Sequence, residues 1–274
     1  MSSLSISKAW DESKAIAARD GRLIGAVALA LVLLPEVVFG VIVPPPALSG
    51  EAVPSWAMAC SLIVAVIGIV GQIAIIRLAL EPASVGEAIS NGFRRVASAI
   101  GALLLFALPL ALILVLLLVA IGGPSAMEAL RGGGGPAPPG VAGAILLFVV
   151  IAVAISIRFQ MVVPVASAET GNPIHILKRS WAMTRGHYWR LLAFLIMILI
   201  LAVVVLLVAQ MFGGILARLV FGDVKPLSVG ALVAALIAGA AQAVVTALSS
   251  LMLARIYVQL SGRGSGAGVP RSGT

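Results

Sequence analysis

Few residues in this sequence are of the types that carry out chemistry in proteins. Its 274 residues include two histidines, one cysteine and ten acidic residues. His175 and His187 are twelve residues apart with Gly186 between them, which is not the spacing of two metal ligands on one element. No nucleophile with a neighbouring base and no acid–base pair stands out. We therefore expect no catalytic site, no metal, no cofactor and no enzymatic activity.

Glu36 is the one acidic residue that lies well inside an apolar run, directly after Pro35. Ionisable residues within membrane spans are rare and are functional candidates. Counted from Arg22, Glu36 lies roughly 20 Å from the inner surface, in the outer half of the bilayer. Gln242 and Thr246 add polar side chains in the last apolar run. A water-lined polar path is the functional interpretation of these residues, and hydrogen bonding between helices is the alternative.

A second group of candidates lies in residues 169–190, the segment richest in basic and aromatic side chains. Pro173 suits the first turn of a helix, and Gly186 suits a left-handed stop. Aromatic rings favour the headgroup level of a membrane, and each basic residue near an anionic leaflet contributes about 1 kcal/mol. We expect an amphipathic helix on the inner membrane surface. Its candidate ligands for a lipid headgroup are Lys178, Arg179, Trp181, Arg185, Trp189 and Arg190.

Both groups need helices that cross a membrane to position them. Hydrophobic residues make up 61% of the chain and charged residues 10%, whereas soluble domains carry about 25% charged residues. A helix needs about 20 apolar residues to cross the hydrocarbon core. The chain is therefore expected to be an all-α polytopic membrane protein. Its six transmembrane helices are predicted at residues 23–43, 56–76, 99–121, 142–157, 191–212 and 229–253.

The basic residues indicate the orientation of these helices. Fifteen of the eighteen lysines and arginines precede the first run, follow the last, or lie in the second and fourth connections. The other three connections contain only Arg131, Arg218 and Lys225. Because loops rich in lysine and arginine remain in the cytoplasm, both termini are predicted to be cytoplasmic.

The second, fourth and sixth apolar runs end alike. Each has an arginine where the apolar residues stop, namely Arg77, Arg158 and Arg255. This pattern favours three tandem units, each an interfacial helix followed by a transmembrane hairpin. The interfacial helices are predicted at residues 1–21, with a turn into the membrane at Arg22, and at the connectors 82–97 and 172–188. Residues 1–262 then form one membrane domain. The Gly/Pro-rich stretch 132–139 is predicted to be a disordered linker, and residues 263–274 a disordered tail.

Small residues predict how the helices pack. In lipid, helices approach closely where glycine and alanine form a smooth face, so the last run is expected to be central in the bundle. Kinks are expected at Pro35 and Pro109, because proline removes a backbone hydrogen bond. The small face recurs at every fourth position, at Ala231, Ala235, Gly239, Ala243 and Ala247.

Three stretches carry a resemblance to a known family: KRSW at 178–181, TRGHYWR at 184–190 and RIYVQL at 255–260. They resemble the signature of the membrane domain attached to some bacterial glycerophosphodiester phosphodiesterases, and similar stand-alone bacterial inner-membrane proteins. Those enzymes need a soluble barrel with histidines and metal-binding carboxylates, which these residues do not supply. The resemblance therefore implies a bacterial inner-membrane module near lipid or envelope metabolism, without the phosphodiesterase activity.

Two functions follow from these features. The first is a non-catalytic membrane protein that binds phospholipid, mainly anionic, or docks a protein partner on its cytoplasmic face. Membrane anchoring and topology setting are the plainer interpretation of the same basic residues. The second is a transporter or channel that moves a small amphiphile along the polar side of the last helix. Nucleic acid is excluded as a partner, because the membrane occupies the basic stems and aromatic rings.

Overall fold

The structure of the protein, a computed structural model, describes residues 4–45, 54–130, 139–222 and 224–262. These residues form helices and no strands. The predicted linker lies outside the described part of the chain except for Pro139, which begins a helix, and so does the predicted tail. In chain order the helices are α1 (Ile6–Ala28), the π-helix η1 (Leu29–Leu33), α2 (Leu34–Ile42), α4 (Ser55–Leu80), α5 (Val85–Leu130), α6 (Pro139–Phe159), α7 (Val162–Ala168), α8 (Pro173–Thr184), α9 (Tyr188–Phe221) and α10 (Val229–Ser261).

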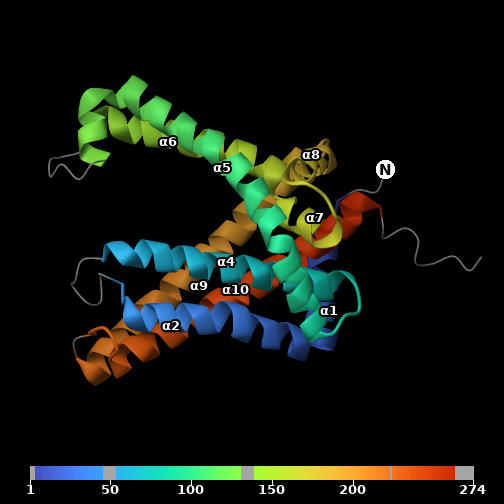
Figure 1. Cartoon of the computed structure of the whole chain (residues 1–274), viewed down its shortest axis with the longest axis horizontal. Coiled ribbons are helices and arrows are strands. Elements are labelled where there is room, and N and C mark those ends of the chain that lie inside the picture. Colours follow the sequence, from blue (N-terminus) through green and yellow to red (C-terminus); the bar gives the residue numbers. More distant parts are fainter. Residues whose placement is uncertain (1–3, 46–53, 131–138, 223, 263–274) are drawn as a thin grey trace, which may run out of the picture.

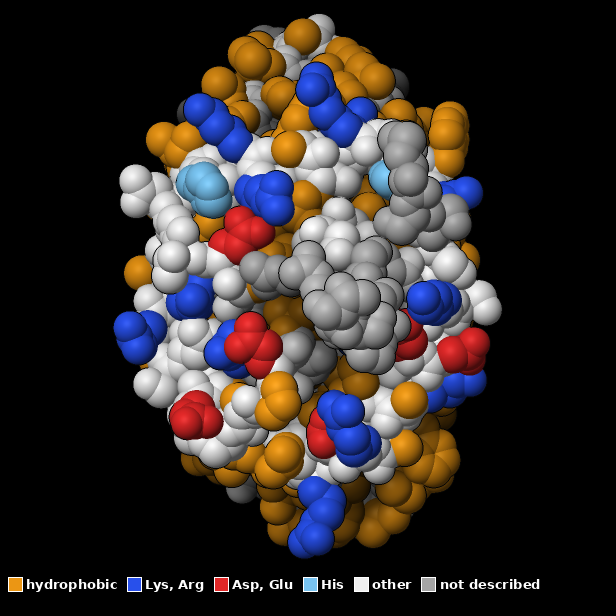
Figure 2. Space-filling view, turned by 90° about the vertical axis from the view of Figure 1, so that its right-hand side faces the viewer, with side chains coloured by type: hydrophobic (Ala, Val, Ile, Leu, Met, Phe, Trp, Pro, Cys, Tyr) orange, Lys and Arg blue, Asp and Glu red, His pale blue; other side chains and the backbone are white. Residues whose placement is uncertain are grey.

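Six apolar stretches of these helices are long enough to cross a membrane, which confirms the all-α polytopic class. Both described ends of the chain lie at the same end of the bundle (Figure 1). Charged side chains gather on that end, called the charged end below (Figure 2). Within the described residues the stretches are Ile6–Ile42, Ser55–Leu80, Val85–Ile121, Gly140–Ala168, Tyr188–Phe221 and Val229–Ser261.

In the N-terminal segment α1 is one continuous helix that runs past Arg22 into the first span. Its buried face, which includes Ala9, Ser13, Ile16, Ile24 and Val27, continues past that point. The first half of α1 is held against α10, since the Ser5 backbone N–H donates to Gln259 Oε1 over 2.9 Å. This contact holds the start of the N-terminal segment at the charged end of α10.

The connector predicted at residues 82–97 is not a separate helix, because α5 begins at Val85 and continues into the third span. The connector predicted at residues 172–188 is a separate helix, α8, which begins at Pro173 as expected. The chain breaks after α8 because Gly186 has a φ of +82°, in the left-handed region that glycine adopts without strain. One of the three expected interfacial helices is thus distinct from the span that follows it.

The two prolines act differently. Before Pro35 the chain forms the π-helix η1, and this wider turn accommodates a ring that would clash with the carbonyl one turn earlier. In α5 the backbone keeps helical dihedral angles at Pro109, and the break falls at Gly123, with a φ of 67°. The expected irregularity is confirmed at Pro35, whereas Gly123 is where α5 departs from helical geometry.

Helix α10 is central, as its small residues predict, and contacts α1, α2, α4, α7, α8 and α9. A Cβ at Gly239 would lie 3.2 Å from Val37 Cγ2 of α2. One Cβ at Gly40 would lie 3.0 Å from Ala235 Cβ of α10. Glycines on both sides therefore allow α2 and α10 to approach closely.

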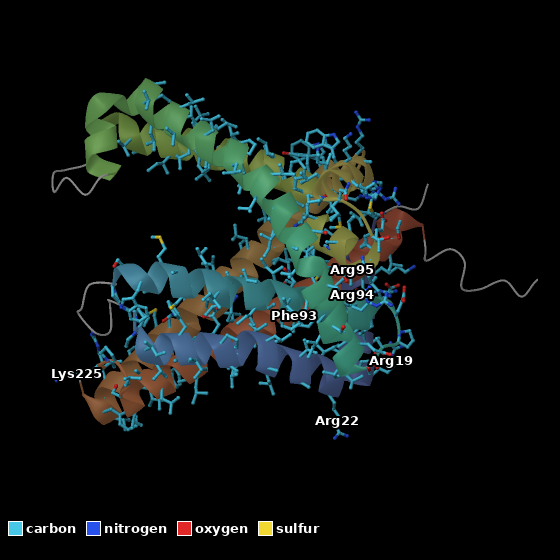
Figure 3. The ribbon with its side chains drawn as sticks, viewed as in Figure 1. Arg19, Arg22, Phe93, Arg94, Arg95 and Lys225 are labelled. Carbon is cyan, nitrogen blue, oxygen red and sulfur yellow. The ribbon has the colours of Figure 1, made fainter. Side chains whose placement is uncertain are left out.

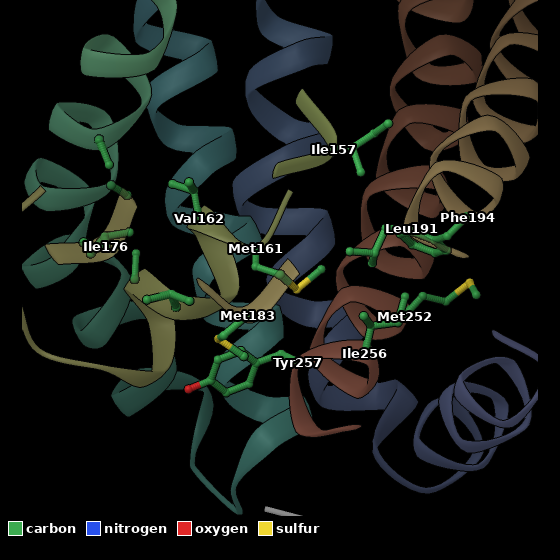
Figure 4. Packing of buried hydrophobic residues seen from close by; sticks show 14 of the residues in the cluster. Ile157, Met161, Val162, Ile176, Met183, Leu191, Phe194, Met252, Ile256 and Tyr257 are labelled. Carbon is green, nitrogen blue, oxygen red and sulfur yellow. The ribbon is translucent and has the colours of Figure 1, made fainter. Parts of the chain in front are cut away.

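The largest hydrophobic core lies at the charged end, where α7 and α8 pack with the ends of α9 and α10. Met161, Met183 and Tyr257 meet there (Figure 4), together with Leu191 and Phe194 of α9. The hairpin of α5 and α6 extends away from α2 and α4 (Figure 1), and many of its large apolar side chains are exposed. The core fixes the charged end, and the hairpin presents apolar surface to the hydrocarbon.

Candidate functional site

Two cavities within the membrane-spanning bundle share Glu36 and Gln242 in their linings. The cavity farther from the charged end, called the distal cavity, has a volume of about 290 Å³ and includes Gly40, Pro44 and Gln210. The nearer one, called the proximal cavity, has a volume of about 430 Å³ and includes Gln72 and Thr246. Glu36 and Gln242 therefore stand where the two cavities adjoin.

Local sequence explains why these two residues come together. Glu36 lies in the first turn of α2, directly after the π-helix that precedes Pro35. Gln242 follows Gly239 by three residues, so both lie on one side of α10. A Cβ at Gly239 would lie 3.6 Å from Glu36 Cβ, and this close approach brings the polar residues of α2 and α10 to the same depth.

We call Glu36, Gln72, Gln210, Gln242 and Thr246 the intramembrane polar cluster. Gln242 Nε2 donates to Thr246 Oγ1 over 3.5 Å within α10. Among the described residues, Glu36, Gln72 and Gln210 have no hydrogen-bond or ion-pair partner. The three intramembrane candidates from the sequence are thus brought together, and hydrogen bonding between helices does not occupy Glu36.

Gln72 and Gln210 are the members that sequence reasoning missed as site residues. Each is a lone polar residue within an apolar run, which predicts a hydrogen bond to a neighbouring helix. In the structure Gln72 lines the proximal cavity and Gln210 the distal one. Their polarity was visible in the sequence, but the facing of α4 and α9 towards α2 and α10 was not.

Glu36 is the one residue of the cluster that can carry a charge. The described residues that line the two cavities include one carboxylate, that of Glu36, and no lysine, arginine or histidine. The remaining lining is amide, hydroxyl and apolar. A carboxylate in a medium of low polarity favours a cation or a strong hydrogen-bond donor, so the cluster is suited to a positively charged or hydrogen-bonding headgroup.

The second candidate group, on α8 and the start of α9, does not form one site. Arg179 Nε contacts Glu169 Oε1 at 3.2 Å, and Arg190 Nη1 donates to the carbonyl of Leu4 over 3.0 Å. The Trp181 ring lies 5.2 Å from Arg158 Cζ, in a cation–π contact. These three side chains hold parts of the fold together.

The other three candidates of this group are Lys178, Arg185 and Trp189, and all are exposed at the charged end. Trp189 is 78% exposed. These residues are free to meet headgroups, but the structure gives them no common pocket.

No group of three or more His, Cys, Asp or Glu side chains in the described residues lies close enough to hold an ion.

Comparison with known proteins adds a family. No curated protein matches the chain. No solved structure matches it either. The resemblance to the membrane domain of glycerophosphodiester phosphodiesterases stays a prediction. One family model matches residues 5–260, which is nearly the whole membrane bundle. The chain therefore belongs to the family described as domain of unknown function DUF7847.

Proposed function

We propose that this protein is a non-catalytic transporter or channel that binds a small amphiphile at the intramembrane polar cluster. The observation that carries this proposal is the pair of cavities that adjoin at Glu36 and Gln242. A plain structural bundle would fill this depth with packed side chains. Here two adjoining cavities, each lined in part by polar residues, leave open space on both sides of the Glu36 side chain.

The chemistry of the linings indicates the kind of molecule. Its head would carry a positive charge or several hydrogen-bond donors, to pair with the Glu36 carboxylate and the Gln242 amide. Its apolar part would lie against Phe39, Val43 and Leu206 in the distal cavity. A cavity of this size is at the small end of those that hold ligands, so the amphiphile is short.

A binding measurement tests this proposal. The full-length protein in lipid nanodiscs is titrated with a fluorescent alkylammonium probe, followed by flux of the probe into proteoliposomes. Glu36→Gln removes the charge and keeps the shape, and we expect binding about tenfold weaker, as for a lost charge-assisted hydrogen bond. Gln242→Leu should weaken binding less, because a neutral partner is lost.

Glu81→Gln is the matched control, since Glu81 is an exposed carboxylate paired with Arg77 and outside both cavities. It should bind and move the probe as the unaltered protein does. Equal affinity in the Glu36→Gln and unaltered proteins would contradict the proposal.

A second candidate function is retention of phospholipid, with a cytoplasmic protein as a further partner. The exposure of Lys178 and Arg185 beside the 78% exposed ring of Trp189 favours it. Replacing Lys178, Arg179 and Arg185 by glutamine should reduce the anionic phospholipid that co-purifies in mild detergent. Because Arg179 also contacts Glu169, the pair Lys178→Gln and Arg185→Gln is the cleaner variant. Unchanged lipid content would contradict this second function.

The setting we propose is the bacterial inner membrane, with the charged end in the cytoplasm. The support is the concentration of lysine and arginine at that end, which follows the positive-inside rule.

A further inference from the structure

A third cavity lies at the charged end, outside the intramembrane polar cluster. It has a volume of about 290 Å³ and lies between α5 and the segment that joins α7 to α8. Arg94, Arg95 and Ser98 line it from α5, and Thr170 and Gly171 line it from the segment. Figure 3 shows Arg94 and Arg95 together on α5 at this end, with Lys225 at the opposite end.

The guanidinium of Arg95 is held in place by three acceptors. Its Nε donates to Asn91 Oδ1 over 2.7 Å. Its Nη1 donates to the backbone carbonyls of Ala166, over 3.1 Å, and of Glu169. These acceptors are neutral groups, so they fix the guanidinium without cancelling its charge. The Glu81 carboxylate interacts with Arg95 electrostatically, but it is paired with Arg77 at 2.7 Å.

Arg94 adds a second positive charge beside the first. It is exposed and has no hydrogen-bond or ion-pair partner among the described residues. Both arginines are lining residues of the cavity. Guanidinium groups pair with phosphate oxygens through charge-assisted hydrogen bonds, and these two line the same cavity.

Glu169 is the one carboxylate among the described residues that line this cavity. Its Oε1 contacts Arg179 Nε at 3.2 Å and accepts a hydrogen bond from the Tyr257 hydroxyl over 2.9 Å. These contacts neutralise and orient the carboxylate, so it does not cancel the charge of Arg94 and Arg95. The cavity is positive overall.

We propose that this cavity is a binding site for a phosphate group. The Arg95 and Arg94 guanidiniums would hold the phosphate oxygens, and the hydroxyls of Ser98 and Thr170 supply further donors. The phosphate belongs to a lipid headgroup or to a soluble ligand, and the two sources share this chemistry. The site does not depend on the amphiphile proposed above, since it shares no lining residue with the Glu36 cavities.

The test compares Arg94→Gln with Arg22→Gln in the full-length protein. Arg94 is the better target than Arg95, because Arg95 also joins α5 to the α7–α8 segment. Arg22→Gln is the matched control, as Arg22 is an exposed arginine at the charged end and outside the cavity. One arm measures phosphatidylglycerol retained from mixed phosphatidylcholine nanodiscs, by native mass spectrometry. The other arm measures inorganic phosphate binding by calorimetry in phosphatidylcholine nanodiscs.

A loss of affinity of about tenfold in Arg94→Gln in one arm, with no loss in Arg22→Gln, supports the site and identifies the source of the phosphate. A loss in the lipid arm alone assigns a headgroup, and a loss in the phosphate arm assigns a soluble ligand. Equal losses in the two variants would show general charge attraction, and no binding in either arm would show no site. Both of these results overturn the proposal.

Discussion

Gly239 of α10 lies directly against Glu36 of α2: a Cβ at position 239 would be 3.6 Å from Glu36 Cβ and 3.5 Å from the carbonyl oxygen of Leu33. The absence of a side chain at 239 brings the carboxylate-bearing helix close to α10. Gly239 also lines the distal cavity with Glu36. One small residue therefore sets both the helix approach and the free space beside the carboxylate.

Gly239→Leu is expected to fill the distal cavity and push α2 from α10. Inserting a large side chain into a packed contact costs about 1–3 kcal/mol. Probe binding should be lost, and the free energy of unfolding should fall by that amount. The measurements are the nanodisc titration and reversible unfolding monitored by circular dichroism.

Ala240→Leu is the control for this change, because Ala240 is the exposed neighbour of Gly239 on the same helix. It should leave both the probe binding and the free energy of unfolding unchanged. Normal probe binding in the Gly239→Leu protein would mean that the distal cavity is not the binding space.

The contact between Glu12 and Arg255 is expected to stabilise the charged end. Arg255 Nε and Nη2 each lie 2.7 Å from Glu12 Oε2. The Glu12 side chain is 27% exposed and that of Arg255 is 23% exposed. Glu12→Gln should lower the free energy of unfolding by about 1–2 kcal/mol. A double-mutant cycle with Arg255→Gln measures the interaction itself.

Asp11→Asn provides the comparison, since the Asp11–Lys14 pair is more than half exposed on both sides. This substitution should lower the free energy of unfolding by less than about 1 kcal/mol. Equal effects of the two substitutions would mean that Glu12 does not hold α1 to α10.

The rings of Trp181 and Tyr188 are expected to stabilise the Arg158 guanidinium. Arg158 Cζ lies 5.2 Å from the Trp181 ring and 5.6 Å from the Tyr188 ring. A cation–π contact at a partly buried site contributes about 0.5–2 kcal/mol. A double-mutant cycle of Trp181→Leu with Arg158→Gln should yield a coupling energy in that range.

The same cycle with Trp189→Leu is the control, because Trp189 is 78% exposed and makes no cation–π contact with Arg158. Its coupling energy should be near zero. A coupling as large as that of Trp181 would indicate an indirect effect through the fold.

The orientation predicts which cysteines an impermeant maleimide can reach. With Cys60 replaced by alanine, Lys225→Cys should react in intact bacterial cells. Lys178→Cys should react only after the cells are permeabilised. Lys225 and Lys178 are both exposed and lie near opposite ends of the bundle, so accessibility depends on the side of the membrane. Reaction of Lys178→Cys in intact cells would invert the proposed orientation.

Much of the fold follows from local patterns. Apolar runs of sufficient length predict six membrane-spanning helices, and the start of α8 at Pro173 and its stop at Gly186 follow from the dihedral preferences of these residues. The contact of the N-terminal segment with the end of α10 could not be read in the same way. It joins Ser5 to Gln259, more than two hundred residues away.

The sequence by itself determined the membrane class, the six membrane-spanning stretches found in the described residues and the central place of α10, because hydropathy and small-residue spacing act along one helix. Tertiary structure alone decided which polar residues share a site. Glu36 and Gln242 line the same cavities because α2 and α10 approach at Gly239. Arg95 faces the α7–α8 segment through contacts 71 and 74 residues apart. Such meetings arise from the relative rotation of packed helices, a quantity that local sequence periodicity does not specify.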